Sequence, residues 1–382
     1  MTWEKVKLGD ISVNIQTGPF GSQLHQSDYC EKGIPVVMPK DLANGKILED
    51  SIARISEEYA EKLKRHRVES GDIIYSRRGD IGRCAYIDKR ERGWICGTGC
   101  LRVTINEERA NSRFIFYQLQ QTSVIGWVIN HAVGSTMLNL NTGILGEVPL
   151  FIPSMEIQGK IVDILSAYDD LIENHQRQIR LLEEAGARLY KEWFVKLRFP
   201  GHDTANITDG VPEGWKKEKI GNIATIHYGK DHKLLSYSGN IPVYGSGGFM
   251  RTCDQFLFDG EAVLIPRKGS LNNIMYVNEK FWTVDTLFYT TLNISEATLY
   301  LYFYLKSRDM YAMNIGAAVP SMTTQILNAM TILIPSNEIL HQFNEEGRSF
   351  YNQIFVLKQK NKILKEARDR LLPRLMRGDV KV

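Results

Sequence analysis

The sequence has 382 residues, of which 43% are hydrophobic and 24% are charged, and its formal net charge is +3 at pH 7. Such a chain is an ordinary globular protein, long enough for two or more domains that each bury a core. No apolar run approaches the length of a membrane span and no basic-then-apolar leader opens the chain, so we expect neither a transmembrane helix nor secretion. The small net charge neither requires nor excludes a nucleic-acid partner, because positive groups can gather on one face.

The five cysteines are odd in number and mostly scattered, which suits a reducing cytoplasm, where we expect the protein to reside. Cys96 and Cys100 are close in sequence, but no second Cys or His pair completes a set of four zinc ligands. We therefore expect no bound metal.

In chain order, residues 1 to about 153 form short mixed segments separated by glycine and polar turns. Residues 71–76 predict a turn and a buried strand, and residues 101–105 alternate in the manner of a second strand. Residues 113–119 open a helix. These elements predict an α+β module.

A heptad pattern follows this module and predicts a long helix. Its positions, apolar or small except for two polar ones in the middle, are Ile157, Ile161, Ile164, Tyr168, Leu171, His175, Gln178, Leu182, Ala185 and Leu189. Ser154 can cap the start of the helix, and Pro200 with Gly201 ends it. Residues 201–210 are polar and rich in turn formers, as in a linker.

The second half of the chain repeats the first. Residues 3–11 resemble 215–223, residues 73–80 resemble 263–270, and residues 152–157 resemble 334–339, in the same order. In this second module, residues 262–265 predict the strand and residues 299–305 predict the helix. A repeat of this length indicates two whole domains and not a solenoid.

A second long helix follows the second module. Its seam positions are Ile339, Phe343, Phe350, Leu357, Leu364, Ala367 and Leu371. Glu346, Gln353 and Lys360 interrupt the alternate seam positions. A rod of about 40 residues, roughly 60 Å long, cannot bury its seam alone, so we expect the two helices to pair in antiparallel fashion. The alternative is that each rod folds back on its own module.

The expected architecture is therefore α+β, with two similar globular domains separated by two long antiparallel coiled-coil helices in a pseudo-two-fold arrangement. The expected boundaries are 1–153 for domain 1, 154–200 for spacer helix 1, 201–210 for the linker, 211–335 for domain 2 and 336–382 for spacer helix 2.

The sequence contains no recognisable catalytic constellation. It lacks the Gly-x-x-x-x-Gly-Lys phosphate loop, the Gly-x-Ser-x-Gly elbow, the His-Glu-x-x-His zinc motif and the Asn/Asp-Pro-Pro-aromatic motif of amino-methyltransferases. The glycine-rich residues 245–248 lack the strand-to-helix setting of a dinucleotide loop and predict a mobile loop. The eight histidines show no ligand spacing. We therefore expect a chain that binds and positions a partner without being an enzyme.

Taken together, this pattern resembles the specificity subunit of type I restriction-modification systems over essentially the whole chain. The resemblance depends on Val-Pro-Glu-Gly-Trp at 211–215, on a strand followed by Arg-Arg-Gly at 77–79 or Arg-Lys-Gly at 267–269, and on Ile-Pro-Ser-x-Glu-Ile before each long helix. The first module begins at Trp3 without the Pro-Glu-Gly lead.

The resemblance implies that each module is a target-recognition domain that reads one half of a bipartite site in double-stranded DNA. It also implies that the paired helices set the spacing of the two halves and carry two methyltransferase subunits and the restriction subunits. S-adenosylmethionine, ATP and magnesium would then belong to those partners, with no cofactor in this chain.

Candidate DNA contacts are donors on loops, because base edges and phosphates are bound by positioned polar side chains. In module 1 the candidates are Phe20, Ser22, Gln23, Arg77, Arg78, Ser135 and Thr136; in module 2 they are Lys230, His232, Lys233, Arg267, Lys268, Ser270, Ser321 and Thr323. The loops at 18–23 and 228–233 correspond in position, as do the segments 134–137 and 317–324. Each set also has an ordinary interpretation as a solvated turn.

Two other functions remain open from sequence alone. A protein-interaction scaffold with two binding modules and no DNA readout would explain the modest charge and the coiled coil. A nuclease or methyltransferase with an unrecognised site is the third hypothesis. The half-site sequences and the spacer length cannot be read from the chain, because they depend on loop geometry, DNA deformability and the register of the helices.

Overall fold

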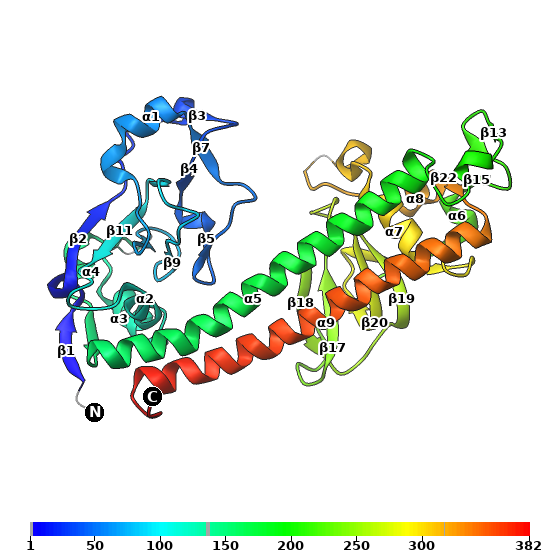
Figure 1. Cartoon of the computed structure of the whole chain (residues 1–382). Coiled ribbons are helices and arrows are strands. Elements are labelled where there is room, and N and C mark those ends of the chain that lie inside the picture. The colour runs from blue at the N-terminus through cyan, green and yellow to red at the C-terminus, as the bar shows by residue number, and fades with distance from the viewer. Residues whose placement is uncertain (1–2, 135–137, 317) are drawn as a thin grey trace. The chain divides into compact units, whose positions relative to one another are not determined.

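The computed structural model describes residues 3–134, 138–316 and 318–382. The chain divides into two compact units: unit 1 comprises Met1–Glu173 with Asn361–Val382, and unit 2 comprises Asn174–Lys360. Two long helices, α5 (Met155–Tyr190) and α9 (Asn337–Met376), each contribute to both units (Figure 1). Each unit thus contains a globular domain and a section of both helices.

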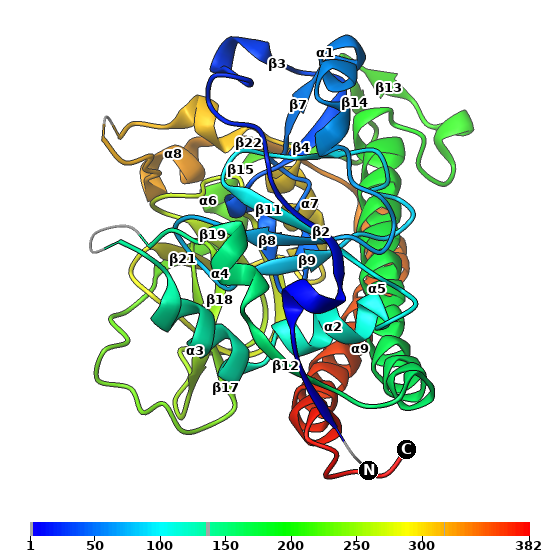
Figure 2. The same ribbon diagram turned by 90° about the vertical axis from the view of Figure 1, so that its left-hand side faces the viewer.

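Unit 1 is built on two small sheets. The first has the antiparallel order β2 (Ser12–Thr17), β11 (Cys100–Ile105), β8 (Ile73–Ser76) and β9 (Cys84–Tyr86), of which β11, β8 and β9 lie side by side in Figure 2. The second has the order β10 (Ile95–Cys96), β4 (Ile34–Val37), β7 (Ala53–Ile55) and β3 (Tyr29–Cys30), with β10 parallel to β4. Two further pairs join β1 (Glu4–Lys7) to β12 (Pro149–Ile152) and β5 (Leu42–Ala43) to β6 (Lys46–Ile47).

The helices of unit 1 besides α5 and α9 are α1 (Glu57–Lys62), α2 (Ser112–Leu119), α3 (Thr122–His131) and α4 (Thr142–Gly146), with 3-10 turns at Leu8–Ile11, Gln26–Asp28, Pro39–Asp41 and Lys64–His66. Helix α2 begins at residue 112 because Asn111 caps it, with its side-chain oxygen accepting from the Phe114 amide at 3.0 Å. The strands predicted at 71–76 and 101–105 and the helix predicted at 113–119 are confirmed by β8, β11 and α2.

Unit 2 contains one larger sheet. Its order is β16 (Ala224–Tyr228), β21 (Leu287–Leu292), β19 (Phe258–Pro266), β20 (Met275–Thr283), β17 (Ile241–Gly245) and β18 (Gly248–Cys253), with β17 parallel to β20. Smaller pairs are β15 (Lys216–Lys219) with β22 (Thr331–Ile334) and β13 (Ile207–Thr208) with β14 (Val211–Pro212). Its helices besides α5 and α9 are α6 (Ile220–Ile223), α7 (Thr298–Lys306) and α8 (Thr324–Ala329), with a π-helical turn at Lys191–Val195 and 3-10 turns at His202–Thr204 and Met310–Met313.

The predicted strand at 262–265 and helix at 299–305 are confirmed as parts of β19 and α7. The glycine-rich segment 245–248 is the turn that joins β17 to β18. The sequence repeat is a structural repeat as well, since Glu4 pairs with Ile152 before α5 and Lys216 pairs with Ile334 before α9. Among the described residues, none of the helices combines the length and apolarity needed to cross a membrane.

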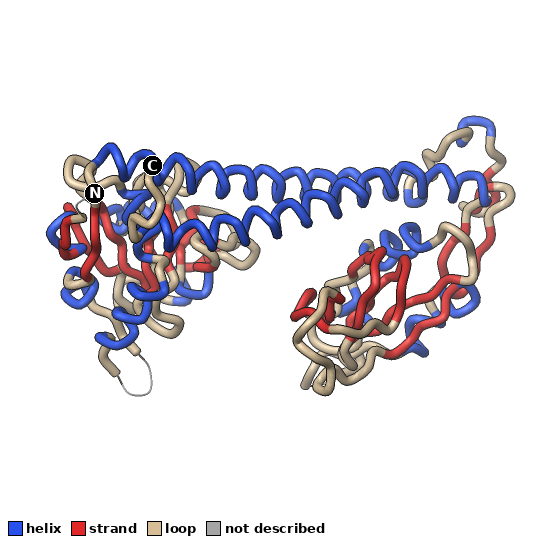
Figure 3. Tube along the Cα trace, turned by 90° about the horizontal axis from the view of Figure 1, so that it is seen from below, coloured by secondary structure: helices blue, strands red, loops and turns tan. Residues whose placement is uncertain are grey.

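The two long helices run antiparallel within each unit (Figure 3). In unit 1, Asp169 of α5 contacts Arg368 of α9, and the Ile172 carbonyl, further along α5, accepts from Asn361, earlier in α9, at 3.4 Å. In unit 2, Tyr190 at the end of α5 lies against Phe343 near the beginning of α9. Antiparallel pairing is therefore confirmed, and the alternative in which each rod packs only on its own module is wrong.

The seam consists of two alternating sets of positions, and burial shows that one set lies one residue later in the chain than the sequence pattern predicted. In α5, Leu165 and Ile172 are buried, whereas the predicted Ile164 is half-buried and the predicted Leu171 is 43% exposed. The same shift occurs in α9: Gly347, Ile354 and Asn361 are buried, whereas Glu346, Gln353 and Lys360 are exposed. Leu171 is thus not a seam residue, and those three polar residues do not interrupt the seam.

The other set lies at the predicted positions. Ile161, Phe343 and Leu357 are buried, and Tyr168, Leu182, Leu189, Phe350, Leu364 and Leu371 are half-buried. The predicted and observed patterns share every seventh residue. From a shared residue such as Ile161, the predicted seam continues after three residues and then after four, whereas the observed seam continues after four residues and then after three. Neighbouring apolar residues such as Leu171 and Ile172 fit both patterns, so the sequence of α5 could not separate them.

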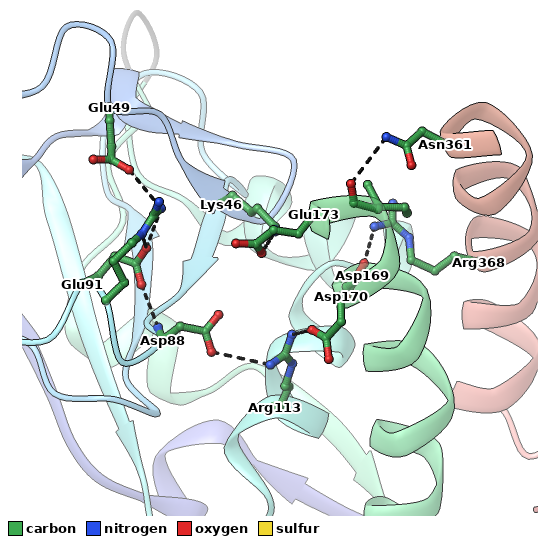
Figure 4. Close-up of polar contacts among 12 residues, drawn as sticks. Lys46, Glu49, Asp88, Glu91, Arg113, Asp169, Asp170, Glu173, Asn361 and Arg368 are labelled. Atoms are coloured by element: carbon green, nitrogen blue, oxygen red, sulfur yellow. Dashed lines mark hydrogen bonds and ion pairs between the residues drawn. The ribbon is translucent and has the colours of Figure 1, made fainter. Parts of the chain in front are cut away.

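A polar network joins the globular domain of unit 1 to its helix sections (Figure 4). At its centre, Asp169 of α5 accepts from the Tyr117 hydroxyl and from Arg368 of α9, each at 2.6 Å. Burial and the nearby Asp169 charge raise the pKa of Tyr117, so its phenol remains a donor at neutral pH. One carboxylate thus joins helix α2 to both long helices.

Further ion pairs extend this network along α5. Arg113 of α2 lies 3.5 Å from Asp88 and 3.6 Å from Asp170. One turn beyond Asp169, Glu173 pairs with Lys46, and that hydrogen bond lowers the pKa of Glu173. These contacts fix the orientation of the first domain against its section of α5.

Unit 2 contains an aromatic cluster where α7 meets its sections of α5 and α9. Phe194, which follows α5, lies with its ring centroid 4.6 Å from that of Tyr300 and 4.8 Å from that of Phe343, both in edge-on geometry. Phe303 and Tyr190 extend the same cluster. Edge-on aromatic pairs add to the free energy gained by burial. The junction of α7 with the two long helices in unit 2 is therefore largely aromatic.

Candidate nucleic-acid interface

In unit 1, Arg77 follows the last residue of β8 and is fixed from several directions. Its amide donates to the Gly99 carbonyl at 2.8 Å, its carbonyl accepts from the Leu140 amide at 2.9 Å, and its Nε donates to Asn139 Oδ1 at 3.2 Å. The guanidinium carbon lies 5.9 Å from the centroid of the Phe20 ring, and Phe20 is 54% exposed. The result is a fixed cation beside an exposed aromatic ring.

Unit 2 repeats this arrangement around Arg267, which follows β19. Its amide donates to the Thr286 carbonyl at 2.8 Å, and its carbonyl accepts from the Met322 amide at 2.9 Å. Its Nη1 donates to the Asp285 carbonyl at 3.2 Å. The guanidinium carbon lies 5.4 Å from the centroid of the Tyr228 ring, and Tyr228 is 53% exposed. We call each of these two arrangements, Arg77 with Phe20 and Arg267 with Tyr228, an arginine–aromatic platform.

A close backbone approach positions the aromatic residue of each platform. Gly18 donates to the Cys100 carbonyl at 2.9 Å, and Gly229 donates to the Leu287 carbonyl at 3.0 Å. A Cβ atom at either glycine would lie 2.0 Å from a backbone carbonyl oxygen, that of Gly97 in unit 1 and that of Val284 in unit 2. Only glycine allows the loop to pass this close to the sheet. The correspondence predicted between the loops at 18–23 and 228–233 therefore has a structural basis in these two glycines.

The platforms are suited to binding phosphate or a base edge. A guanidinium presents several donors in one plane, and an aromatic ring beneath it restricts its orientation without using those donors. Burial lowers the pKa of Arg77, with a smaller contribution from the charge of Arg78. The next residues, Arg78 and Lys268, are exposed and lie on turns in which Gly79 and Gly269 have φ of +75° and +86°. Each platform thus carries a second cation directly beside it.

The structure gives the remaining predicted residues different settings. Ser22, Gln23, Lys230, Lys233 and Ser270 are exposed on loops, whereas His232, Ser321 and Thr323 are half-buried. Ser135 and Thr136 lie outside the described residues. The Thr323 hydroxyl accepts from the Ile326 amide at 3.3 Å and caps α8, and the Ser321 hydroxyl donates to the Val319 carbonyl at 2.8 Å. Both hydroxyl groups therefore have a local structural role.

The correspondence predicted between segments 134–137 and 317–324 needs correction. Arg78 forms an isolated bridge with Asn139, and Lys268 forms the equivalent bridge with Ser321. The structural counterpart of Ser321 is therefore Asn139, which comes after the predicted segment. Asn139 could not be predicted from the sequence, because its partner, Arg77, lies 62 positions away and no local motif links them.

A second missed residue is Arg251 on β18. Its guanidinium lies 4.2 Å from the centroid of the Tyr237 ring and donates to backbone carbonyls of the loop that follows Tyr228. An isolated arginine in a strand carries no sequence signal for this role.

Three buried cysteines of unit 1 lie on its strands, Cys84 on β9, Cys96 on β10 and Cys100 on β11. Within the described ranges, no three His, Cys, Asp or Glu side chains are grouped to hold a metal ion. Cys84 and Cys96 are buried, which raises the pKa of each thiol to about 12, and burial also raises the pKa of Cys100. These three thiols are therefore protonated at neutral pH.

The class of protein follows from comparison with known families. Residues 1–184 and 212–366 both match the family described as type I restriction modification DNA specificity domain. These matches cover most of the chain, and they coincide with the two structural repeats. The chain therefore belongs to this family, and the resemblance seen in the sequence is confirmed.

Particular relatives cover the whole chain. The specificity subunit of type I restriction enzyme MjaIX from Methanocaldococcus jannaschii is 25% identical, with 100% of this chain and 94% of the relative aligned. The specificity subunit of type I restriction enzyme HindI from Haemophilus influenzae is 21% identical, with 99% of each chain aligned. A crystal structure of a type I restriction-modification S subunit from M. genitalium has the same fold, with a TM-score of 0.61, 16% identity, and 98% of this chain and 96% of that chain covered.

Proposed function

We propose that this chain is a non-catalytic specificity subunit in which each unit reads one half of a bipartite site in double-stranded DNA. The observation that carries the proposal is the duplication of the arginine–aromatic platform. Equivalent backbone contacts hold Arg77 and Arg267, while the surrounding loops differ in sequence and length. A repeated scaffold with unlike loops is what two unlike half-sites require.

The paired helices would form the docking surface for two methyltransferase subunits and for restriction subunits. Support comes from the relatives, which are named as specificity subunits of type I restriction enzymes. In this proposal S-adenosylmethionine, ATP and magnesium act in the partner subunits. In this proposal the chain selects the DNA target and sets the spacing of its two halves, and the partner subunits carry out the reactions.

The test uses the complex of this chain with its methyltransferase subunits. Replacing Arg267→Ala and Lys268→Ala together should weaken binding to cognate duplex DNA by about tenfold or more, and should reduce the slope of log affinity against log salt by about 2. The matched control is Lys216→Ala with Lys217→Ala, which removes two exposed lysines from β15 of the same unit.

Complex assembly, followed by size-exclusion chromatography, should be unchanged in both double variants. Equal DNA affinity for the two double variants would contradict DNA reading at the Arg267 platform and would favour a protein-interaction scaffold. The Arg77→Ala and Arg78→Ala variant tests unit 1 in the same way. Mapping methylated bases in the host genome would give the two half-sites and their spacing.

A further inference from the structure

The loop 229–240 of unit 2 is held at both ends although most of its side chains are exposed. It begins directly after Tyr228, so it leaves the sheet at the arginine–aromatic platform. Lys230 anchors its start: its amide donates to the Thr283 carbonyl at 2.9 Å, and its carbonyl accepts from Trp282 Nε1 at 3.1 Å. Gly239 anchors its end, where a Cβ atom would lie 2.2 Å from the Cys253 carbonyl oxygen.

Arg251 fixes the middle of this loop. Its Nη2 donates to the His232 carbonyl at 2.6 Å, and its Nη1 donates to the Ser236 carbonyl at 3.1 Å. Its guanidinium lies over the ring of Tyr237. One side chain thus joins three points of the loop to β18, and hydrogen bonds from a charged donor are stronger than neutral ones.

Two adjacent leucines show what this anchoring achieves. Leu235 is buried at 7% exposure with Val243 and Trp282, whereas Leu234 is 100% exposed. An aliphatic side chain that is fully in water on an anchored loop gains nothing in the unbound protein. The anchoring therefore holds Leu234 outward at a defined position.

Charged groups accompany this leucine. Lys230 and Lys233 are exposed and precede it in the same loop. The carboxylate of Asp231 accepts from the Lys233 amide at 3.0 Å, so it is used within the loop. Two cations beside an outward aliphatic side chain fit a polyanion that also offers an apolar group.

Duplex DNA offers one apolar group on its base edges, the 5-methyl group of thymine in the major groove. We propose that Leu234 contacts a thymine methyl group in the half-site read by unit 2, that Lys230 and Lys233 contact nearby phosphates, and that Arg251 is the positioning residue of this loop. This inference rests on the proposed function. The contact is expected in unit 2 alone: Leu24, six residues after Gly18, corresponds to the buried Leu235, six residues after Gly229, and the position of Leu234 is occupied in unit 1 by the exposed Gln23.

The experiment measures binding of the full chain in complex with its methyltransferase subunits to the mapped cognate duplex. Each thymine of the half-site assigned to unit 2 is replaced in turn by deoxyuridine, which removes only the methyl group. Wild-type complex should lose about fourfold in affinity at one of these positions, as expected for one buried methyl group. The Leu234→Ala complex should bind the unmodified site more weakly by a similar factor and should show no further loss with deoxyuridine.

Arg251→Ala should abolish the same deoxyuridine effect while the melting temperature of the complex stays near the wild-type value. A purely structural role of Arg251 would lower the melting temperature and leave the methyl sensitivity intact. Ile207→Ala serves as a matched control, since Ile207 is an aliphatic residue of β13 in unit 2, is 46% exposed and lies outside this loop; it should retain the deoxyuridine effect.

Equal deoxyuridine sensitivity of wild-type and Leu234→Ala complexes would overturn the inference, as would a unit 2 half-site without thymine. Because Leu234 is fully exposed, its replacement does not endanger folding, and the inference stays testable if Arg251→Ala is unstable. Failure of the proposed function would be distinct: the Arg267→Ala and Lys268→Ala variant would then bind DNA as the wild type does.

Discussion

Arg368 donates a hydrogen bond to Asp169 at 2.6 Å, although 199 positions separate the two residues. The pair joins the last part of α9 to the first part of α5, and Tyr117 of the globular domain donates to the same carboxylate. Beyond it, Leu375 and Met376 are buried in the core of unit 1. The last turns of α9 are therefore part of the first domain.

Replacing Arg368→Ala should destabilise unit 1. The two side chains are 25% and 12% exposed, and removal of one partner leaves a largely buried charge with less compensation. We expect a loss on the order of 2 kcal/mol, measured as faster hydrogen–deuterium exchange in α2 and the end of α9. Arg370→Ala is the control, because Arg370 is exposed on the same helix. Equal exchange in the two variants would show that the ion pair does not stabilise unit 1.

Adjacent residues on α5 test the seam register. Ile172 is 4% exposed and Leu171 is 43% exposed. Ile172→Ala should therefore cost about 2–4 kcal/mol, whereas Leu171→Ala should cost less than about 1 kcal/mol. Thermal unfolding of the complex of this chain with its methyltransferase subunits gives the comparison. A larger effect at Leu171 would restore the register predicted from the sequence.

Gly18 and Gly229, which position the aromatic residues of the two platforms, should not tolerate a larger side chain. A Cβ atom in Gly18→Ala or Gly229→Ala would lie 2.0 Å from a carbonyl oxygen, so the loop must move away from the sheet. We expect each variant to lose about 1–3 kcal/mol of stability and to weaken DNA binding by displacing Phe20 or Tyr228. Gly21→Ala is the control, because no neighbouring atom of the described residues would lie within 4 Å of its Cβ. DNA-binding titrations and melting curves of the three variants decide the question.

Unit 1 should lose stability as the pH falls below neutrality. His66 is 2% exposed, and burial, with smaller contributions from Arg65 and Arg102, lowers its pKa to about 4. The unfolded chain, with a pKa near 6.5, binds the proton first, so the stabilising contribution is complete above about pH 6.5 and is lost between that value and about pH 4.

Between about pH 7 and pH 5 this single residue should cost about 2 kcal/mol. Denaturation curves of the wild type and of His66→Gln, which cannot titrate, should therefore differ in their pH dependence by this amount. Parallel pH profiles would show that His66 does not retain a lowered pKa in the folded protein.

The fold was largely predictable because it depends on periodicity and repetition, which the sequence displays directly. The heptads, the Ile-Pro-Ser lead into each helix, and the strand before Arg77 and before Arg267 all appear as local patterns. The seam register failed in α5 because Leu171 and Ile172 are both apolar. In α9, the apolar Ile354 indicates the observed register. The predicted register instead places Glu346, Gln353 and Lys360 in the seam, where they count as interruptions.

The site was only partly predictable, because a loop residue acquires its role from distant partners. Arg77 and Arg267 could be named from their motif, but Asn139 and Arg251 could not, since each acts through contacts made across the fold. Thr323 was named as a polar loop residue, and the structure gives its hydroxyl a helix to cap. Whether it also contacts DNA stays a prediction.

The composition of unit 1 has a consequence for synthesis on the ribosome. Residues 174–360 emerge as one uninterrupted segment that contains all of unit 2, whereas unit 1 needs residues 361–382, which are translated afterwards. The domain that is translated first is thus the last to be completed. A nonsense mutation or a stalled ribosome near residue 360 would release a chain with a finished second domain and an unfinished first one, and proteolytic quality control could recognise the exposed core of that first domain.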